Sequence, residues 1–222
     1  MSRKDHINEY AVIGLGRFGS SLASDLTRRG ASVLGIDREA DLVQRYADEI
    51  TDTAILDSTD ETALREVDLM SYKTVVVAIG NNFEASLITT SILKSFGVPN
   101  VITKAQTRRQ KDILLRMGAN RVVLPEYEAG QLLAHELTHP GVIDQFDLGP
   151  GYTISELTLP PRWAGLALSD VGLRAKFGAT ALVVKRGNDV NVVPPSGFVL
   201  EASDIIVIVG THKAIEEISA LE

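Results

Sequence analysis

A glycine pattern near the start of the chain has the spacing of a phosphate-binding turn. Gly14, Gly16 and Gly19 form G-x-G-x-x-G, with Arg17 and Phe18 in the two variable places. Gly14 permits the tight turn, Gly16 lets the backbone approach a phosphate, and Gly19 lets a helix pack closely on a strand. Because free N–H groups at a helix start bind anions, the pattern predicts a nucleotide phosphate here.

An acidic side chain follows at the distance that such a turn requires. Asp37 comes 18 residues after Gly19, where its carboxylate can accept hydrogen bonds from both ribose hydroxyls and repel a 2′-phosphate. An adenosine nucleotide such as ADP, ATP or NAD is therefore favoured over NADP, although Arg38 weakens that exclusion slightly. Arg17 would add a cation beside the pyrophosphate, and its alternative is a solvated arginine in a first helical turn.

Two further turns are expected to border the same crevice. Asp57 and Ser58 follow the third expected strand, and Ala78, Ile79, Gly80 and Asn81 end the fourth. Asp57 and Ser58 are candidates to hold the adenine edge, while residues 78–81 would pass beneath the sugar and phosphates. The alternative is ordinary turn chemistry, because Asp, Ser and Asn stabilise turns wherever they occur.

Lys104 and Glu126 end the fifth expected strand and follow the sixth. The Lys104 ammonium group, at the rim of the expected crevice, could bind a phosphate or contact a neighbouring subunit. A carboxylate there fits a bridging cation, Mg²⁺ or Na⁺, with Glu126 as its ligand, or else an ion pair with Lys104.

Two other motifs are interpreted as ordinary surface. Residues 135–139 spell H-E-x-x-H, the zinc peptidase pattern, but Pro140 and Gly141 follow at once and no third histidine is near. A helix end carrying two histidines is the preferred interpretation. The basic run 108–111 is expected to be a solvated helix face, and a net charge of −7 argues against a nucleic-acid partner.

The elements that must position these residues alternate along the first part of the chain. Short β-branched runs alternate with amphipathic stretches, which is typical of an α/β doubly wound parallel sheet. The expected strands are Tyr10–Gly14, Ser32–Ile36, Thr53–Leu56, Thr74–Ile79, Asn100–Lys104 and Arg121–Leu124, and the clearest helix is Phe83–Phe96.

Proline and glycine punctuation near residue 140 predicts two domains, 1–140 and 141–222. The second is predicted to be a small α+β domain. Its expected elements are strand Tyr152–Leu159, helix Leu168–Phe177, and strands Thr180–Lys185, Val190–Val193 and Ile205–Val209.

Length and composition set the remaining limits. The 222 residues can bury at least one core, and the absence of cysteine excludes disulfides and thiolate chemistry. No apolar run reaches the roughly 18 residues of a membrane span, so a cytoplasmic protein is expected.

Several of these segments together resemble the RCK (Trk-N and Trk-C) family. The resemblance rests on residues 11–19, 35–37, 77–80, 104–105, 117–122 and 125–126, and on residues 173–178 and 202–210 for the C-terminal part. It covers nearly the whole chain. One RCK-N (Rossmann-like) domain followed by one RCK-C domain is most similar to the cytosolic regulatory subunits of Ktr potassium uptake systems.

The resemblance implies a regulator and not an enzyme. It implies dimers assembled into an octameric ring beneath a KtrB-like membrane subunit that translocates potassium, at the inner face of the cell membrane. ATP and ADP, and also NAD(H), are the implied ligands, with Arg17 near the γ-phosphate from a neighbouring subunit and Glu126 near a nucleotide-linked cation. The alternative function is a small NAD-dependent oxidoreductase, because the fold alone does not fix function.

Overall fold

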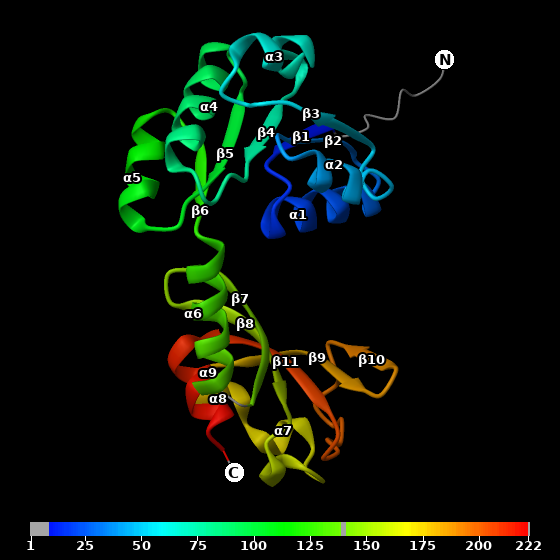
Figure 1. Ribbon diagram of the computed structural model, residues 1–222. Helices are drawn as coiled ribbons and strands as arrows, with labels where there is room; N and C mark the ends of the chain where they lie inside the picture. Colours follow the sequence, from blue (N-terminus) through cyan, green and yellow to red (C-terminus); the bar gives the residue numbers. More distant parts are fainter. Residues whose placement is uncertain (1–8, 139–140, 222) are drawn as a thin grey trace, which may run out of the picture. The chain divides into compact units, whose positions relative to one another are not determined.

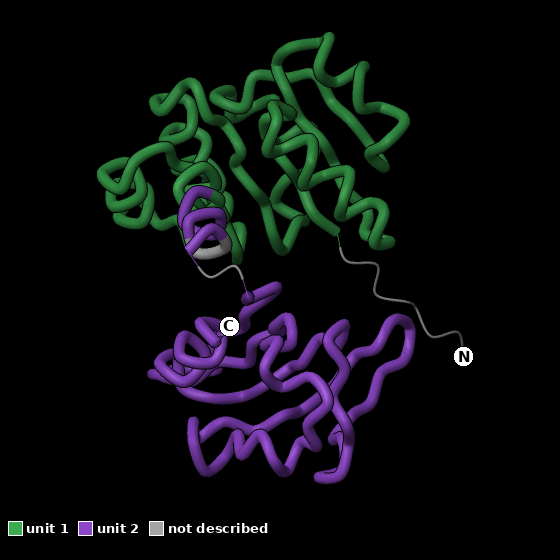
Figure 2. Tube along the Cα trace, turned by 90° about the horizontal axis from the view of Figure 1, so that it is seen from below, with its two compact units in different colours: residues 1–129 green, residues 130–222 purple. Residues whose placement is uncertain are grey.

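The computed structural model describes residues 9–138 and 141–221. The chain forms two compact units, residues 1–129 and 130–222, coloured separately in Figure 2. The division falls within helix α6 (Pro125–Thr138). The predicted domain boundary near residue 140 stays a prediction. His139, the last residue of the H-E-x-x-H match, lies outside the described residues.

The first unit contains a six-stranded sheet in which every strand pair is parallel, in the order β3-β2-β1-β4-β5-β6 (Figure 1). This order places β1 and β4 side by side, where the winding of the sheet reverses and ligands of such folds bind. The predicted doubly wound sheet is confirmed. Its strands are β1 (Glu9–Ile13), β2 (Ser32–Asp37), β3 (Asp52–Ile55), β4 (Thr74–Val77), β5 (Asn100–Lys104) and β6 (Arg121–Val123).

Apolar side chains on both faces of this sheet are covered. On one face Ile13 and Val75 pack with Leu64 of α3 and Leu93 of α4; on the other, Val12 packs with residues of α1 and α2. Strands buried on both sides need nearly continuous apolar sequence, as the central strands β1, β2 and β4 have. The helices are α1 (Arg17–Arg28), α2 (Ala40–Tyr46), α3 (Glu61–Glu66), α4 (Phe83–Ser95) and α5 (Arg108–Arg116), with a short 3₁₀ turn, η1 (Leu69–Ser71).

The second unit is an antiparallel five-stranded sheet in the order β10-β9-β11-β8-β7, with helices packed against it. This confirms the predicted α+β class. The elements are β7 (Val142–Gly149), β8 (Tyr152–Thr158), η2 (Pro161–Trp163), α7 (Leu168–Val171), α8 (Leu173–Phe177), β9 (Thr180–Arg186), β10 (Asp189–Val192), β11 (Ile205–Thr211) and α9 (His212–Ser219).

Two local predictions in this unit differ from the structure. Residues 142–149 form the edge strand β7, which the sequence interpretation did not include. The single helix expected over 168–177 is two short helices, because Gly172 adopts a left-handed conformation with φ of +68° between them. A left-handed residue cannot continue a right-handed helix, and glycine adopts it at little cost.

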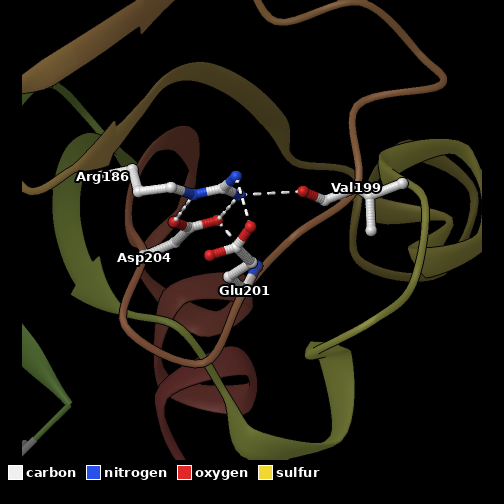
Figure 3. Close-up of polar contacts among 4 residues, drawn as sticks. All are labelled: Arg186, Val199, Glu201 and Asp204. Atoms are coloured by element: carbon white, nitrogen blue, oxygen red, sulfur yellow. Dashed lines mark hydrogen bonds and ion pairs between the residues drawn. The ribbon is translucent and has the colours of Figure 1, made fainter.

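An ion pair to a buried carboxylate joins the end of β9 in the second unit to the loop between β10 and β11 (Figure 3). Arg186 Nε and Nη2 donate to the two carboxylate oxygens of Asp204 at 2.7 and 2.8 Å. The same guanidinium donates to the Val199 carbonyl and to Glu201, and Glu201 N–H donates back to Asp204. The Arg186 side chain therefore fixes the loop that leads into β11.

Candidate functional site

A cleft of about 210 Å³ lies at the carboxyl ends of the central strands of the first unit. It is formed by the segments that follow β1, β2, β3 and β4, which is where an open parallel sheet binds its ligands. Ten of the residues singled out in the sequence line it: Gly14, Gly16, Asp37, Arg38, Asp57, Ser58, Ala78, Ile79, Gly80 and Asn81.

The turn after β1 is pressed against the end of β4. Gly14 has φ of +97°, and a Cβ added there would lie 3.1 Å from the Ala78 carbonyl carbon and the Ile79 nitrogen. A Cβ at Gly19 would lie 1.8 Å from the Gly14 oxygen. Gly14 therefore makes the turn and Gly19 the close helix packing, the roles that the spacing predicts.

Gly16 faces open space at the start of α1. It is the residue before the first turn of the helix, no side chain caps that turn, and a Cβ added there would meet no atom within 4 Å. The first N–H groups of a helix have no partner within it, and the positive end of the helix dipole lies there. This geometry fits a phosphate group on the α1 N-terminus.

Asp37 already holds the turn together. Its Oδ2 accepts the Leu15 N–H at 2.6 Å, and its Oδ1 accepts the Glu39 N–H at 2.9 Å. Each carboxylate oxygen has a second lone pair, so the group retains capacity to accept from ribose hydroxyls. Arg38 is engaged with its neighbour Glu39 at 3.2 Å on the exposed rim.

The turn after β3 is fixed from two sides. Asp57 Oδ1 accepts from both the N–H and the hydroxyl of Thr59, and these hydrogen bonds hold the pKa of the Asp57 carboxyl below its usual range. Ser58 is buried and its hydroxyl lies 2.9 Å from that of Thr89 in α4. Ordinary turn chemistry is thus present at Asp57, in a turn that also forms part of the cleft wall.

Five sequence candidates lie outside the cleft lining: Arg17, Phe18, Gly19, Lys104 and Glu126. Lys104 Nζ donates to Glu126 at 2.8 Å, with 11% of the lysine side chain and 67% of the glutamate exposed. The Lys104 hydrogen bond is the main cause that lowers the pKa of Glu126; Arg17 adds a smaller charge effect. Among the two alternatives for this pair, the structure contains the ion pair.

Lys104 nevertheless borders the cleft wall. Its Nζ lies 5.8 Å from the centre of the Phe18 ring, and a Cβ at Gly80 would come within 3.5 Å of it. Among the side chains that the structure describes, which leave out those of His135 and Glu136, no three His, Asp or Glu groups converge as a metal site. A cation at Glu126 therefore needs oxygen ligands from a nucleotide or another chain.

Sequence reasoning missed several residues of the cleft. Leu42 and Leu56 add apolar surface near Asp37, and Asn82 and Ala85 contribute from the start of α4. Thr89, which contacts the cleft residue Ser58 without lining the cleft itself, was missed as well, although Ser86, Thr89 and Thr90 are polar residues at helical spacing on the buried face of α4. That polar spacing was the available signal, because buried hydroxyls need partners.

Comparison with known proteins identifies the family. Residues 10–125 match the TrkA-N domain, and residues 152–221 match the TrkA-C domain. The chain belongs to the TrkA-N/TrkA-C (RCK) family. It is 37% identical to Ktr system potassium uptake protein C of Bacillus subtilis, over 91% of this chain and 92% of that protein. It is 35% identical to Ktr system potassium uptake protein A of the same organism, over 94% of each.

A solved RCK structure shares the fold. The GsuK channel bound to NAD superposes with a TM-score of 0.65 at 16% identity, covering 99% of this chain and 40% of the channel chain. The RCK family of the Ktr relatives is non-enzymatic, which confirms that this chain is not an enzyme and removes the oxidoreductase alternative. None of the helices described for this RCK protein has the length and apolar character of a membrane span.

Proposed function

We propose that this RCK protein is the nucleotide-binding regulatory subunit of a Ktr-type potassium uptake system. An adenine nucleotide, ATP or ADP, binds the cleft of the first unit, and NAD(H) is a second ligand of the same chemistry. The observation that carries the proposal is the geometry at Gly16. This residue lies in the cleft at the N-terminus of α1, where no side chain caps the helix and the space beside its Cα is empty. Support also comes from the Ktr relatives and from the NAD-bound GsuK channel.

The nucleotide acts by binding two arrangements of the assembly unequally. A ligand shifts an equilibrium only by its difference in affinity, and about 1–3 kcal/mol per site is typical of such coupling. The γ-phosphate provides that difference. Arg17 is exposed and forms no ion pair with the described part of the chain, so it is free to reach the γ-phosphate bound by a neighbouring subunit.

The proposed partner is a KtrB-like membrane subunit that carries the ion pathway. The regulatory chains form dimers, assembled into an octameric ring on the cytoplasmic side of the membrane. In the ATP form Arg17 draws adjacent lobes together, and in the ADP form this contact is lost and the dimer relaxes. A nucleotide-linked Mg²⁺ or Na⁺ held by Glu126 is part of the proposal.

The test separates nucleotide binding from control of transport. Potassium flux is measured in vesicles that hold the membrane subunit and the full-length chain, with ATP or ADP, for wild type and Arg17→Ala. We expect nearly unchanged ADP affinity by calorimetry and loss of the ATP-over-ADP difference in flux. Arg28→Ala is the matched control, because Arg28 is an exposed arginine at the other end of α1.

Two results would overturn this function. The first is the absence of binding of ATP, ADP and NAD to ligand-stripped wild-type protein in calorimetry. The second is full ATP-over-ADP control of flux in Arg17→Ala, which would show that Arg17 does not read the γ-phosphate.

A further inference from the structure

The turn Asp57–Thr59 and helix α4 form a closed set of hydrogen bonds at one end of the cleft. Thr89 Oγ1 lies 3.0 Å from the Ser58 carbonyl oxygen and 2.9 Å from Ser58 Oγ. Thr89 is completely buried and Ser58 is 6% exposed, so both hydroxyls are shielded from bulk water. Thr59 donates its hydroxyl to Asp57 at 2.7 Å.

Counting protons fixes the direction of each bond. A threonine hydroxyl has one hydrogen, and only a donor can bond to the Ser58 carbonyl, so the Thr89 hydrogen is used there. Ser58 Oγ must then donate its own hydrogen to Thr89 Oγ1. With the Thr59 hydrogen on Asp57, all three side-chain O–H groups donate within the protein. None of these hydrogens is left for a ligand.

The oxygens keep their accepting capacity. Asp57 is a carboxylate with a lowered pKa, so it remains charged and accepts only. Its Oδ1 receives both bonds from Thr59, which leaves Oδ2 available. Ser58 Oγ retains a lone pair as well. Both residues line the cleft beyond Asp37, on the side away from the glycine turn, where the base of a nucleotide must lie if its phosphates occupy the α1 N-terminus.

We propose that Thr89 is a positioning residue that makes the Asp57 and Ser58 side chains a wall of hydrogen-bond acceptors at the base end of the cleft, so that this chain selects a purine with a 6-amino group over one with a 6-oxo group. This inference rests on the proposed nucleotide site and adds its base specificity. A 6-amino group can donate a hydrogen bond to Asp57 or Ser58. A 6-oxo group would instead place its oxygen against the lone pairs of these two side chains, with no hydrogen between them. A polar site that leaves its groups unpaired rejects a ligand strongly.

The experiment compares ATP with ITP, which differ at this position by amino against carbonyl. Both dissociation constants are measured by calorimetry on the full-length chain. We expect wild type to bind ATP at least about tenfold more tightly, the ratio of roughly one lost hydrogen bond. Equal affinities in wild type would overturn the inference and leave nucleotide binding intact, whereas absence of binding of both would overturn the proposed function itself.

Three threonine variants test the role of Thr89. Thr89→Val keeps the shape and removes the hydroxyl, which frees the Ser58 hydrogen to donate to a 6-oxo group, so the ITP-to-ATP ratio of dissociation constants should fall severalfold. Thr89→Ser should restore it. Thr90→Val is the matched control, since Thr90 is equally buried on α4 but donates to the Ser86 carbonyl within the helix.

The ITP-to-ATP ratio of dissociation constants is informative because a purely structural defect weakens the binding of both nucleotides equally. An unchanged ratio in Thr89→Val would overturn the positioning role. Asp57→Asn gives a second route that does not touch the core, because Asp57 is exposed. The amide oxygen can still accept from Thr59, while its NH₂ replaces an acceptor by a donor, so this variant should also lower the ratio. A wild-type ratio in this variant would contradict the acceptor wall.

Discussion

Three glycines of one turn have different neighbours. A Cβ at Gly14 or Gly19 would meet backbone atoms at 3.1 Å or less, whereas a Cβ at Gly16 would meet none within 4 Å. Folding therefore requires the first and last glycine. Gly16 is dispensable for folding, and its empty side fits the approach of a phosphate to the backbone.

The variant Gly16→Ala should lose nucleotide affinity while the free energy of unfolding changes by less than about 0.5 kcal/mol. The added methyl group occupies the space that a phosphate would enter but touches no protein atom. Calorimetry with ADP and urea unfolding measure the two quantities. Gly19→Ala is the contrasting variant, which should lower stability severely. Wild-type ADP affinity in Gly16→Ala would place the phosphates elsewhere.

The pair of Lys104 and Glu126 gives a prediction for protonation. Lys104 lowers the pKa of Glu126, so Lys104→Met should raise that pKa towards the usual glutamate range. Because the folded pKa is lowered, the pair stabilises the fold above the usual range, and that contribution is lost as pH falls through the lowered pKa. An NMR titration of Glu126 in both proteins measures the shift. A pKa that stays low in Lys104→Met would assign it to Arg17 or the backbone instead.

The lining of the cleft could be predicted from the sequence where the spacing of a residue within a motif indicates its place. Gly14, Gly16 and Asp37 line the cleft as the pattern predicts. Lys104 and Glu126 were expected at the correct strand ends, but both the ion pair and a cation were compatible with their charges. The polar spacing of Ser86, Thr89 and Thr90 indicated buried hydroxyls on α4 but not their partners, because the role of Thr89 depends on α4 lying against a turn 31 residues earlier in the chain.

Among the elements, the ion pair between β9 and the start of β11 ties a long loop to the second sheet. Asp204 has a fully buried side chain, and Arg186 is 32% exposed. A buried carboxylate needs this partner and the Glu201 N–H, because desolvation without compensation is costly. Together with backbone hydrogen bonds from residues 165–169 to Ser196, Phe198 and Leu200, the pairing holds residues 194–203 in the folded unit.

We expect Asp204→Ala to lower the free energy of unfolding by about 3 kcal/mol, because it removes the two hydrogen bonds from Arg186 and the acceptor of Glu201 N–H. Arg186 holds the pKa of Asp204 below its usual range, so this stabilisation is present at neutral pH and is lost as pH falls through that lowered value. Urea unfolding at several pH values measures both effects. Glu201→Gln, at a 59% exposed side chain, is the control and should cost under about 1 kcal/mol.

The predicted elements agree with the structure best where hydrophobic pattern and burial coincide. All six parallel strands were expected within a few residues, and the central strands β1, β2 and β4 show why, since their apolar residues are buried. Strand β7 was missed since six of its eight residues are exposed, and only one is buried. This edge strand needs few apolar residues, because backbone hydrogen bonds to β8 hold it in the sheet. The break at Gly172 was missed because the residues on both sides favour a helix.

For the molecule as a whole, the proposed function predicts an oligomer whose form depends on the bound nucleotide. Native mass spectrometry of the full chain of 24.0 kDa should give an octamer with ATP, in keeping with the proposed ring. Arg17→Ala should weaken the ATP-dependent form and leave the ADP-dependent form intact. A monomer under all nucleotide conditions would contradict regulation by subunit rearrangement.

The carboxylate of Asp37 is held by the backbone on both sides before any ligand is considered. When a binding loop already has its bound conformation, ordering that loop does not reduce the free energy of association. Occupancy can then follow the ratio of competing metabolites in the surrounding fluid, with exchange limited by how quickly the resident molecule escapes. Under the proposed function, this preformed turn would let the bound nucleotide exchange continuously as the ratio of ATP to ADP in the cell changes.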